Sequence, residues 1–177
     1  MPYLRANTDA PFGAMPYDGT LRIRPYNKVV GYATRIFPGD FVTLVAAGNV
    51  QVAAAGDRLL GVAAENSAAS TAKGDFLVYD HPNQLFVVQN DDGGTALAQT
   101  NVGNNADILA TAGDTTTGRS LHELDQSDAQ TTTAQLKIVG AHECEDSTPG
   151  TRVFGANRKV IVRIAEHIYG SGSESGV

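Results

Sequence analysis

The sequence predicts an all-β protein, folded as a small antiparallel β-barrel or β-sandwich, and three observations support this prediction. First, a Gly-Asp turn leads twice into an apolar, aromatic and β-branched segment, at residues 39–45 and 74–78, and such turns commonly begin short strands. Second, the 19 glycines and 7 prolines recur at intervals that fit many turns rather than long helices. Third, the apolar runs are short and evenly spaced, which is typical of barrels and sandwiches.

Composition narrows the class of protein further. A chain of 177 residues can bury one sizeable core. Its net charge of −6 argues against binding to nucleic acid or to an anionic membrane, because both require clustered Lys and Arg. Charged residues make up only 18% of the chain, below the usual quarter, as in subunits that stay in contact with others. The single cysteine, Cys144, cannot form an internal disulfide, which fits assembly in a reducing cytoplasm.

Two further expectations concern the membrane. No stretch approaches the roughly 18 to 20 apolar residues of a membrane span. The first residues lack the apolar run of a signal peptide. We therefore expect a soluble protein that has no membrane partner.

Residues 1–19 are predicted to form an extended N-terminal arm. The segment is rich in Pro, Gly, Asn and Asp, and its few apolar side chains cannot by themselves offset the entropy cost of ordering it. It is either a frayed terminus or an arm that docks on a neighbouring subunit. In the second case the contacts with the partner would include Tyr3, Leu4, Arg5 and Phe12.

Residues 20–169 are predicted to form the β-rich domain. At its start, residues 20–24 alternate strictly between apolar and charged side chains, and residues 26–37 continue as sheet material. The alternation predicts two inward side chains, Leu21 and Ile23, and two outward ones, Arg22 and Arg24. In an acidic protein the two arginines are candidate contacts for an acidic partner.

The rest of this domain is expected to hold short strands around a polar insertion. Short apolar runs predict strands at residues 41–45, 50–53, 59–62, 76–79 and 85–88. Residues 90–133, dominated by Asn, Asp, Thr, Gly, Ala and Gln, are predicted to be a loop-rich insertion with a weak strand or short helix. Strand periodicity returns at residues 134–140 and 159–165, and the Gly-Ser-Glu tail at 170–177 should be disordered.

No catalytic, cofactor-binding or metal-binding residue is predicted. Residues 142–146, His-Glu-Cys-Glu-Asp, hold several potential ligands, but adjacent ligands cannot all turn inward and no second cluster lies at zinc spacing. Residues 118–122, Gly-Arg-Ser-Leu-His, have His where a nucleophile elbow requires its second Gly. Residues 55–59, which contain Asp57, are reminiscent of a strand in dUTPase-type pyrophosphatases, but the other motifs of that family are missing.

Several segments resemble the capsid decoration, or cement, proteins of tailed bacteriophages. These are residues 101–109 (Asn-Val-Gly-Asn-Asn-Ala-Asp-Ile-Leu), 117–120 (Thr-Gly-Arg-Ser), 131–140 and 155–167, and the Gly-Asp-Phe strand entries resemble phage head accessory proteins. The resemblance implies a β-rich subunit, often a homotrimer, on the outer surface of the capsid. Its partners would be the major capsid protein and further copies of itself, and the family supplies no catalytic residues.

Two other functions remain as alternatives. One is a different phage tail or surface module that binds carbohydrate or a host, although the absence of Trp counts against a carbohydrate site. The other is an oligomeric enzyme with a site shared between subunits, for which Asp57 would be the residue to mutate. The decoration protein, made in the host cytoplasm and carried on the virion, is the preferred hypothesis.

Overall fold

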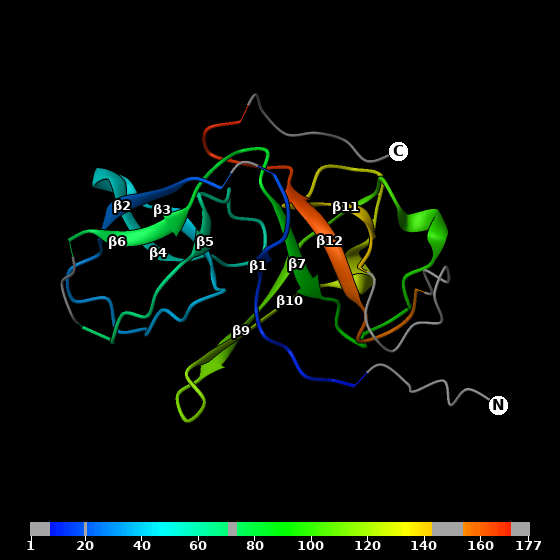
Figure 1. The fold of residues 1–177 in the computed structure, drawn as a ribbon, viewed down its shortest axis with the longest axis horizontal. Helices are drawn as coiled ribbons and strands as arrows, with labels where there is room; N and C mark the ends of the chain where they lie inside the picture. Colours follow the sequence, from blue (N-terminus) through cyan, green and yellow to red (C-terminus); the bar gives the residue numbers. More distant parts are fainter. Residues whose placement is uncertain (1–7, 20, 71–73, 143–153, 171–177) are drawn as a thin grey trace.

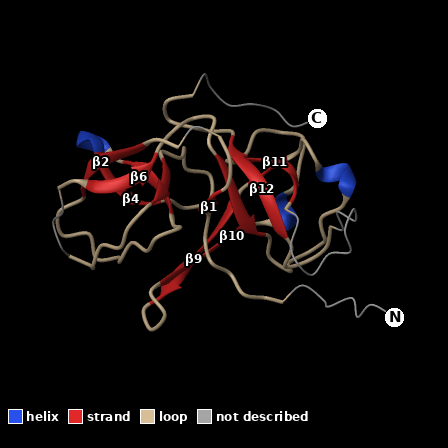
Figure 2. Ribbon diagram, viewed as in Figure 1, coloured by secondary structure: helices blue, strands red, loops and turns tan. Residues whose placement is uncertain are grey.

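The computed structural model describes residues 8–19, 21–70, 74–142 and 154–170. These residues form strands and three short 3-10 turns, and the described part of the chain contains no α-helix (Figure 2). The predicted all-β class is confirmed. The strands are arranged in two adjacent lobes, a closed barrel and a five-stranded sheet, with a two-stranded hairpin extending between them (Figure 1).

The first lobe is a closed five-stranded barrel. Its strands follow the spatial order β2-β4-β3-β5-β6, with the bounds β2 Ile23–Lys28, β3 Phe41–Leu44, β4 Asn49–Val52, β5 Gly61–Ala63 and β6 Phe76–Tyr79. All neighbouring pairs are antiparallel except β2 and β4, which are parallel. The 3-10 turn η1 (Ala46–Gly48) connects β3 to β4. The barrel is filled by buried apolar side chains: Ile36, Val42, Val50, Leu60, Ala63, Phe76 and Val78.

The second lobe is an antiparallel sheet with the order β1-β7-β12-β11-β8. Its strands are β1 Met15–Pro16, β7 Leu85–Gln89, β12 Lys159–Ile164, β11 Leu136–Ala141 and β8 Asn105–Ala106. The central pair, β7 and β12, supplies fully buried side chains from both strands, including Phe86, Val88, Val160 and Val162. These side chains belong to the larger of the two hydrophobic cores.

Two barrel strands contribute to both cores. On β3, Phe41 points into the larger core while its neighbour Val42 points into the barrel, and on β5, Val62 and Ala63 are divided in the same way. Successive side chains of a strand point to opposite faces, so a strand buried on both faces carries apolar side chains at consecutive positions, as at Phe41-Val42 and Val62-Ala63. This accounts for the continuous apolar runs of the sequence at these positions.

The polar region at residues 90–133 has more strand structure than its composition predicts. It contains the hairpin β9 (Ile108–Asp114) and β10 (Arg119–Leu124), strand β8, and the 3-10 turns η2 (Gln99–Asn101) and η3 (Gln126–Asp128). Side-chain amides replace apolar groups at buried positions here. The Asn90 amide donates to the Gln126 side chain at 2.6 Å, and the Asn105 amide donates to the Thr132 carbonyl at 3.0 Å. Buried amides of this kind are stable only when they are hydrogen-bonded, and they conceal the usual hydrophobic pattern.

The described part of the predicted arm, residues 8–19, packs on its own chain. Strand β1 pairs with β7 through Met15–Val87 and Pro16–Phe86. The Ala14 N–H donates to the Gly39 carbonyl at 2.9 Å, and the Ala14 side chain is buried in the larger core. Within residues 8–19, Met15 and Pro16 therefore form the edge strand of the sheet, and Ala14 lies in the core.

The predicted orientation of the first strand is wrong. Leu21 and Ile23 are 62% and 46% exposed instead of facing the core. β2 ends at Lys28, so the sheet does not continue to residue 37 as expected. The reason is the pairing with β6, which places Arg24 opposite Val78 and Tyr26 opposite Phe76. Both partners face the barrel interior, so Ile23 must face outward.

Candidate partner-binding site

One end of the barrel is closed by a cluster of charged and aromatic side chains around Asp80. The Asp80 carboxylate is fully buried. It accepts hydrogen bonds from Arg22 Nε at 2.8 Å and from Arg24 Nε and the Tyr26 hydroxyl. Burial raises the pKa of Asp80, but the bonds from Tyr26, Arg22 and Arg24 outweigh it and hold the pKa below its ordinary value. The two predicted arginines are thus brought together, and both still expose part of their side chains.

Apolar side chains lie exposed beside this cluster, on the outer side of β2 and β6. Ile23 is opposite Tyr79 and Pro25 is opposite Leu77, so Ile23 and Leu77 are diagonal neighbours on one face. Leu77 is 38% exposed, and Leu21 precedes the strand. We call Leu21, Ile23 and Leu77 the barrel face. Because large apolar side chains gathered at the surface commonly mark a contact site, the barrel face is the first candidate surface.

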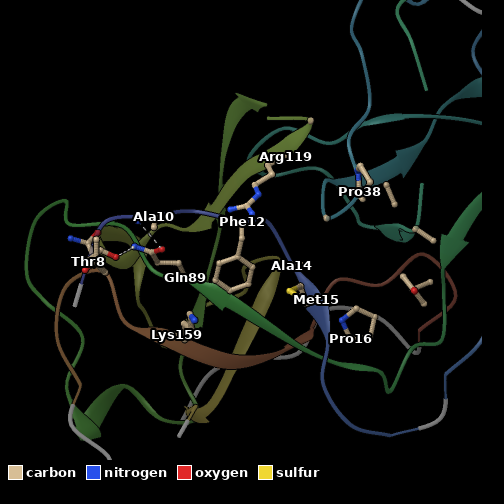
Figure 3. A pocket seen from close by; sticks show the side chains of 16 residues that line it. Thr8, Ala10, Phe12, Ala14, Met15, Pro16, Pro38, Gln89, Arg119 and Lys159 are labelled. Atoms are coloured by element: carbon tan, nitrogen blue, oxygen red, sulfur yellow. Dashed lines mark hydrogen bonds between the residues drawn. The ribbon is translucent and has the colours of Figure 1, made fainter. Parts of the chain in front are cut away.

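A groove of about 710 Å³ is the second candidate surface (Figure 3). It lies among the N-terminal segment, the barrel turn at Pro38 and the beginnings of β10 and β12. Apolar groups from the N-terminal segment and the turn line it: Phe12, Met15, Pro16 and Pro38. Its charged lining residues are two cations, Arg119 and Lys159.

Hydrogen bonds hold the N-terminal segment along this groove. The Gln89 side chain accepts from the Ala10 N–H at 3.3 Å and donates to the Thr8 carbonyl at 3.2 Å. Lys159 Nζ lies 5.4 Å from the centre of the Phe12 ring, within the range of a cation–π interaction. Figure 3 shows the Phe12 ring between the side chains of Arg119 and Lys159.

The structure separates the predicted contact residues into two places. Arg22 and Arg24 lie beside the barrel face, and Phe12 lines the groove. Tyr3, Leu4 and Arg5, together with Cys144, lie outside the described residues. The sequence reasoning missed the barrel face and the pair of cations. The alternation of residues 20–24 defines two faces without showing which one is exposed, and no local pattern links Arg119 to Lys159.

Residues 118–122, the segment compared above with a nucleophile elbow, contribute Ser120 and His122 to a buried contact between the hairpin and the barrel. Ser120 is fully buried on β10, and a Cβ atom at Gly13 would lie 2.5 Å from its Cβ atom. His122 Nδ1 accepts from the Phe41 N–H at 3.2 Å, and its Nε2 lies 3.7 Å from an Asp40 oxygen. Burial lowers the pKa of His122 to about 4, so this imidazole is neutral at pH 7.

Asp40 is also buried in this contact. Burial raises its pKa to about 6, although hydrogen bonds from the Phe37 N–H and from Ser120 oppose the shift. Asp57, the residue of the alternative enzyme hypothesis, accepts from the Ala54 N–H at 2.9 Å and shapes a turn. Both carboxylates therefore make local structural hydrogen bonds.

We expect the free energy of unfolding to depend on pH through the carboxyl group of Glu123. Burial, followed by repulsion from Asp9, Asp91 and Asp92, raises its pKa from 4.5 to about 7. The folded state keeps this proton to a higher pH than the unfolded state, so stability should fall as the pH rises from 4.5 to 7. We expect Glu123→Gln to be more stable than wild type at pH 8 by on the order of 2 kcal/mol and equal to it at pH 4, as measured by urea unfolding.

Glu65→Gln is the matched control. Glu65 accepts a hydrogen bond from the Leu77 N–H, which a Gln side chain can still accept. It should not be more stable than wild type at pH 8, because it loses a charge-assisted hydrogen bond. A Glu123→Gln change that shifts the unfolding midpoint equally at pH 4 and pH 8 would contradict the assignment.

Within the described residues, no three His, Cys, Asp or Glu side chains are grouped so that they could hold a metal ion. No helical segment in the same part of the chain has the length and apolar character of a membrane span. Comparison with protein-family models, curated proteins and solved structures finds no match for this chain.

Proposed function

We propose that this chain is a structural virion protein that binds the outer surface of a bacteriophage head and stabilises contacts between neighbouring major capsid proteins. The observation that carries the proposal is the barrel face, where Leu21 and Ile23 are 62% and 46% exposed. Covering such side chains removes apolar area from water, at about 25 cal/mol per Å². The resemblance of the sequence to decoration proteins implies that the partner of this surface is the major capsid protein.

The net charge of the chain supports a position on the outer surface of the capsid. The net charge of −6 would be repelled by packaged DNA, whereas the capsid exterior imposes no such repulsion. Arg22 and Arg24 alternate with Leu21 and Ile23 along the chain and bind Asp80 from the other side of β2. They keep 37% and 44% of their side chains exposed, and these exposed parts can contact acidic groups of a capsid protein.

The mechanism is binding by several copies. The family resemblance favours a homotrimer, and a trimer would present three barrel faces at once. Linked contacts raise the overall affinity far above that of one contact without new chemistry. Neighbouring capsid subunits held by one such assembly would resist separation.

The experiment is co-sedimentation with expanded heads of the phage that encodes the chain. Ile23→Asp removes about 2 kcal/mol of apolar burial per contact and places a charge in the interface. We expect it to weaken binding at least tenfold, and thermal unfolding of the free variant checks that the barrel remains folded, since Ile23 is 46% exposed in the free protein. The measured quantity is the occupancy of heads as a function of protein concentration.

Val30→Asp is the matched control. Val30 is 76% exposed but lies beyond the end of β2 and outside the barrel face. It should bind heads as wild type does. Failure of the wild-type protein to bind heads, or equal binding by Ile23→Asp, would refute the proposal.

A further inference from the structure

The groove concentrates positive charge in an acidic protein. The chain has 19 acidic and 13 basic residues. The groove nevertheless has Arg119 and Lys159 in its lining and no carboxylate among the residues that line it. In the described part of the chain neither cation forms an ion pair with a carboxylate. A site of this charge is complementary to an anionic group.

The two cations flank an apolar ring. Figure 3 shows Phe12 between them, with Met15, Pro16 and Pro38 farther along the groove. The Lys159 contact with the Phe12 ring fixes one ammonium group at this position. An occupant can thus place one carboxylate at Arg119 and a second at Lys159, on opposite sides of the Phe12 ring, and an apolar side chain over Met15 and Pro38.

The groove also has the volume of a ligand site. The volume of about 710 Å³ falls within the roughly 300 to 1,000 Å³ of sites that enclose a small ligand or a short peptide.

We propose that the groove binds an extended segment of a partner protein in which two acidic side chains lie next to an apolar one. Arg119 and Lys159 each bind one carboxylate, on opposite sides of the Phe12 ring, and the apolar side chain covers Met15 and Pro38. The guanidinium of Arg119 can form paired hydrogen bonds to its carboxylate, whereas Lys159 acts as a point charge. This inference does not depend on the phage-head proposal, because it concerns a different surface and is tested with a free peptide.

The test is NMR titration of the isotope-labelled full chain with the heptapeptide Gly-Ser-Glu-Leu-Glu-Ser-Gly. We expect chemical-shift changes centred on Phe12, Arg119 and Lys159. The same peptide with Gln in place of both Glu residues should bind at least fivefold more weakly. The double variant Arg119→Gln/Lys159→Gln should bind the acidic peptide at least tenfold more weakly than wild type.

Arg35→Gln is the matched control, since Arg35 pairs with Asn66 on a barrel loop and does not line the groove. It should bind the acidic peptide as wild type does. Three results would overturn the proposal: no shifts at the groove at millimolar peptide, equal binding of the acidic and amide peptides, or full displacement by inorganic phosphate at the peptide's own concentration. The last result would identify a general anion site.

Discussion

Asp80→Asn should destabilise the protein by about 3 kcal/mol, because it leaves two guanidinium groups facing a neutral amide at the end of the barrel. In the wild type, Arg22, Arg24 and Tyr26 all donate to this fully buried carboxylate. The arginines keep part of their exposure, which limits the cost relative to a completely buried pair. Urea unfolding at pH 7 measures the effect as a lower midpoint at unchanged slope.

The pH dependence of this effect follows from the lowered pKa of Asp80. A carboxyl whose pKa is lowered by folding contributes stability above its unfolded pKa, near 3.8, and loses it as the pH falls through the folded value. The difference between wild type and Asp80→Asn should therefore shrink below pH 4. Asp75→Asn, the same exchange at an exposed position just before β6, should change stability by less than about 0.5 kcal/mol. Equal midpoints for the two variants would show that the cluster does not stabilise the barrel.

Gly61→Ala should have the largest effect of any single methyl group added to the barrel. A Cβ atom at Gly61 would lie 2.0 Å from the Tyr79 carbonyl oxygen and 2.9 Å from its carbon. Both are backbone atoms of the neighbouring strand β6, so the clash cannot be relieved by rotating a side chain. We expect destabilisation of about 4 kcal/mol or more, measured by thermal and urea unfolding.

Gly140→Ala provides the comparison, because no atom lies within 4 Å of a Cβ placed there. It should unfold within about 0.5 kcal/mol of wild type. If Gly61→Ala does not accumulate as a folded protein while Gly140→Ala does, the barrel contact is supported in the same way. A Gly61→Ala protein as stable as Gly140→Ala would mean that β5 and β6 do not approach as described.

The barrel strands could be predicted from the sequence because their signals are local. The Gly-Asp turns before Phe41 and Phe76 begin β3 and β6, and apolar runs mark β5 in the barrel and β7 in the second lobe. Which face of β2 is buried could not be predicted, because alternation defines two faces of a strand without showing which one faces the core. Here the choice depends on Asp80, which lies 56 residues after Arg24 and buries its carboxylate against both arginines.

The strand content of the polar insertion and the presence of the groove could not be predicted, for different reasons. The insertion buries hydrogen-bonded amides such as Gln126 and Asn105, and in a sequence these residue types indicate loops. The groove depends on topology, since Arg119 begins β10 and Lys159 begins β12 in another sheet. Only the folded chain brings these two cations to either side of Phe12.

The sharing of β3 and β5 between two cores has a mechanical consequence. Phe41 and Val42 are covalent neighbours, yet they anchor in different lobes. Close-packed interiors are nearly incompressible and transmit strain. A pull exerted on the outside of the barrel is therefore relayed to the large sheet through peptide bonds, so the two lobes carry tension as a single stiff element.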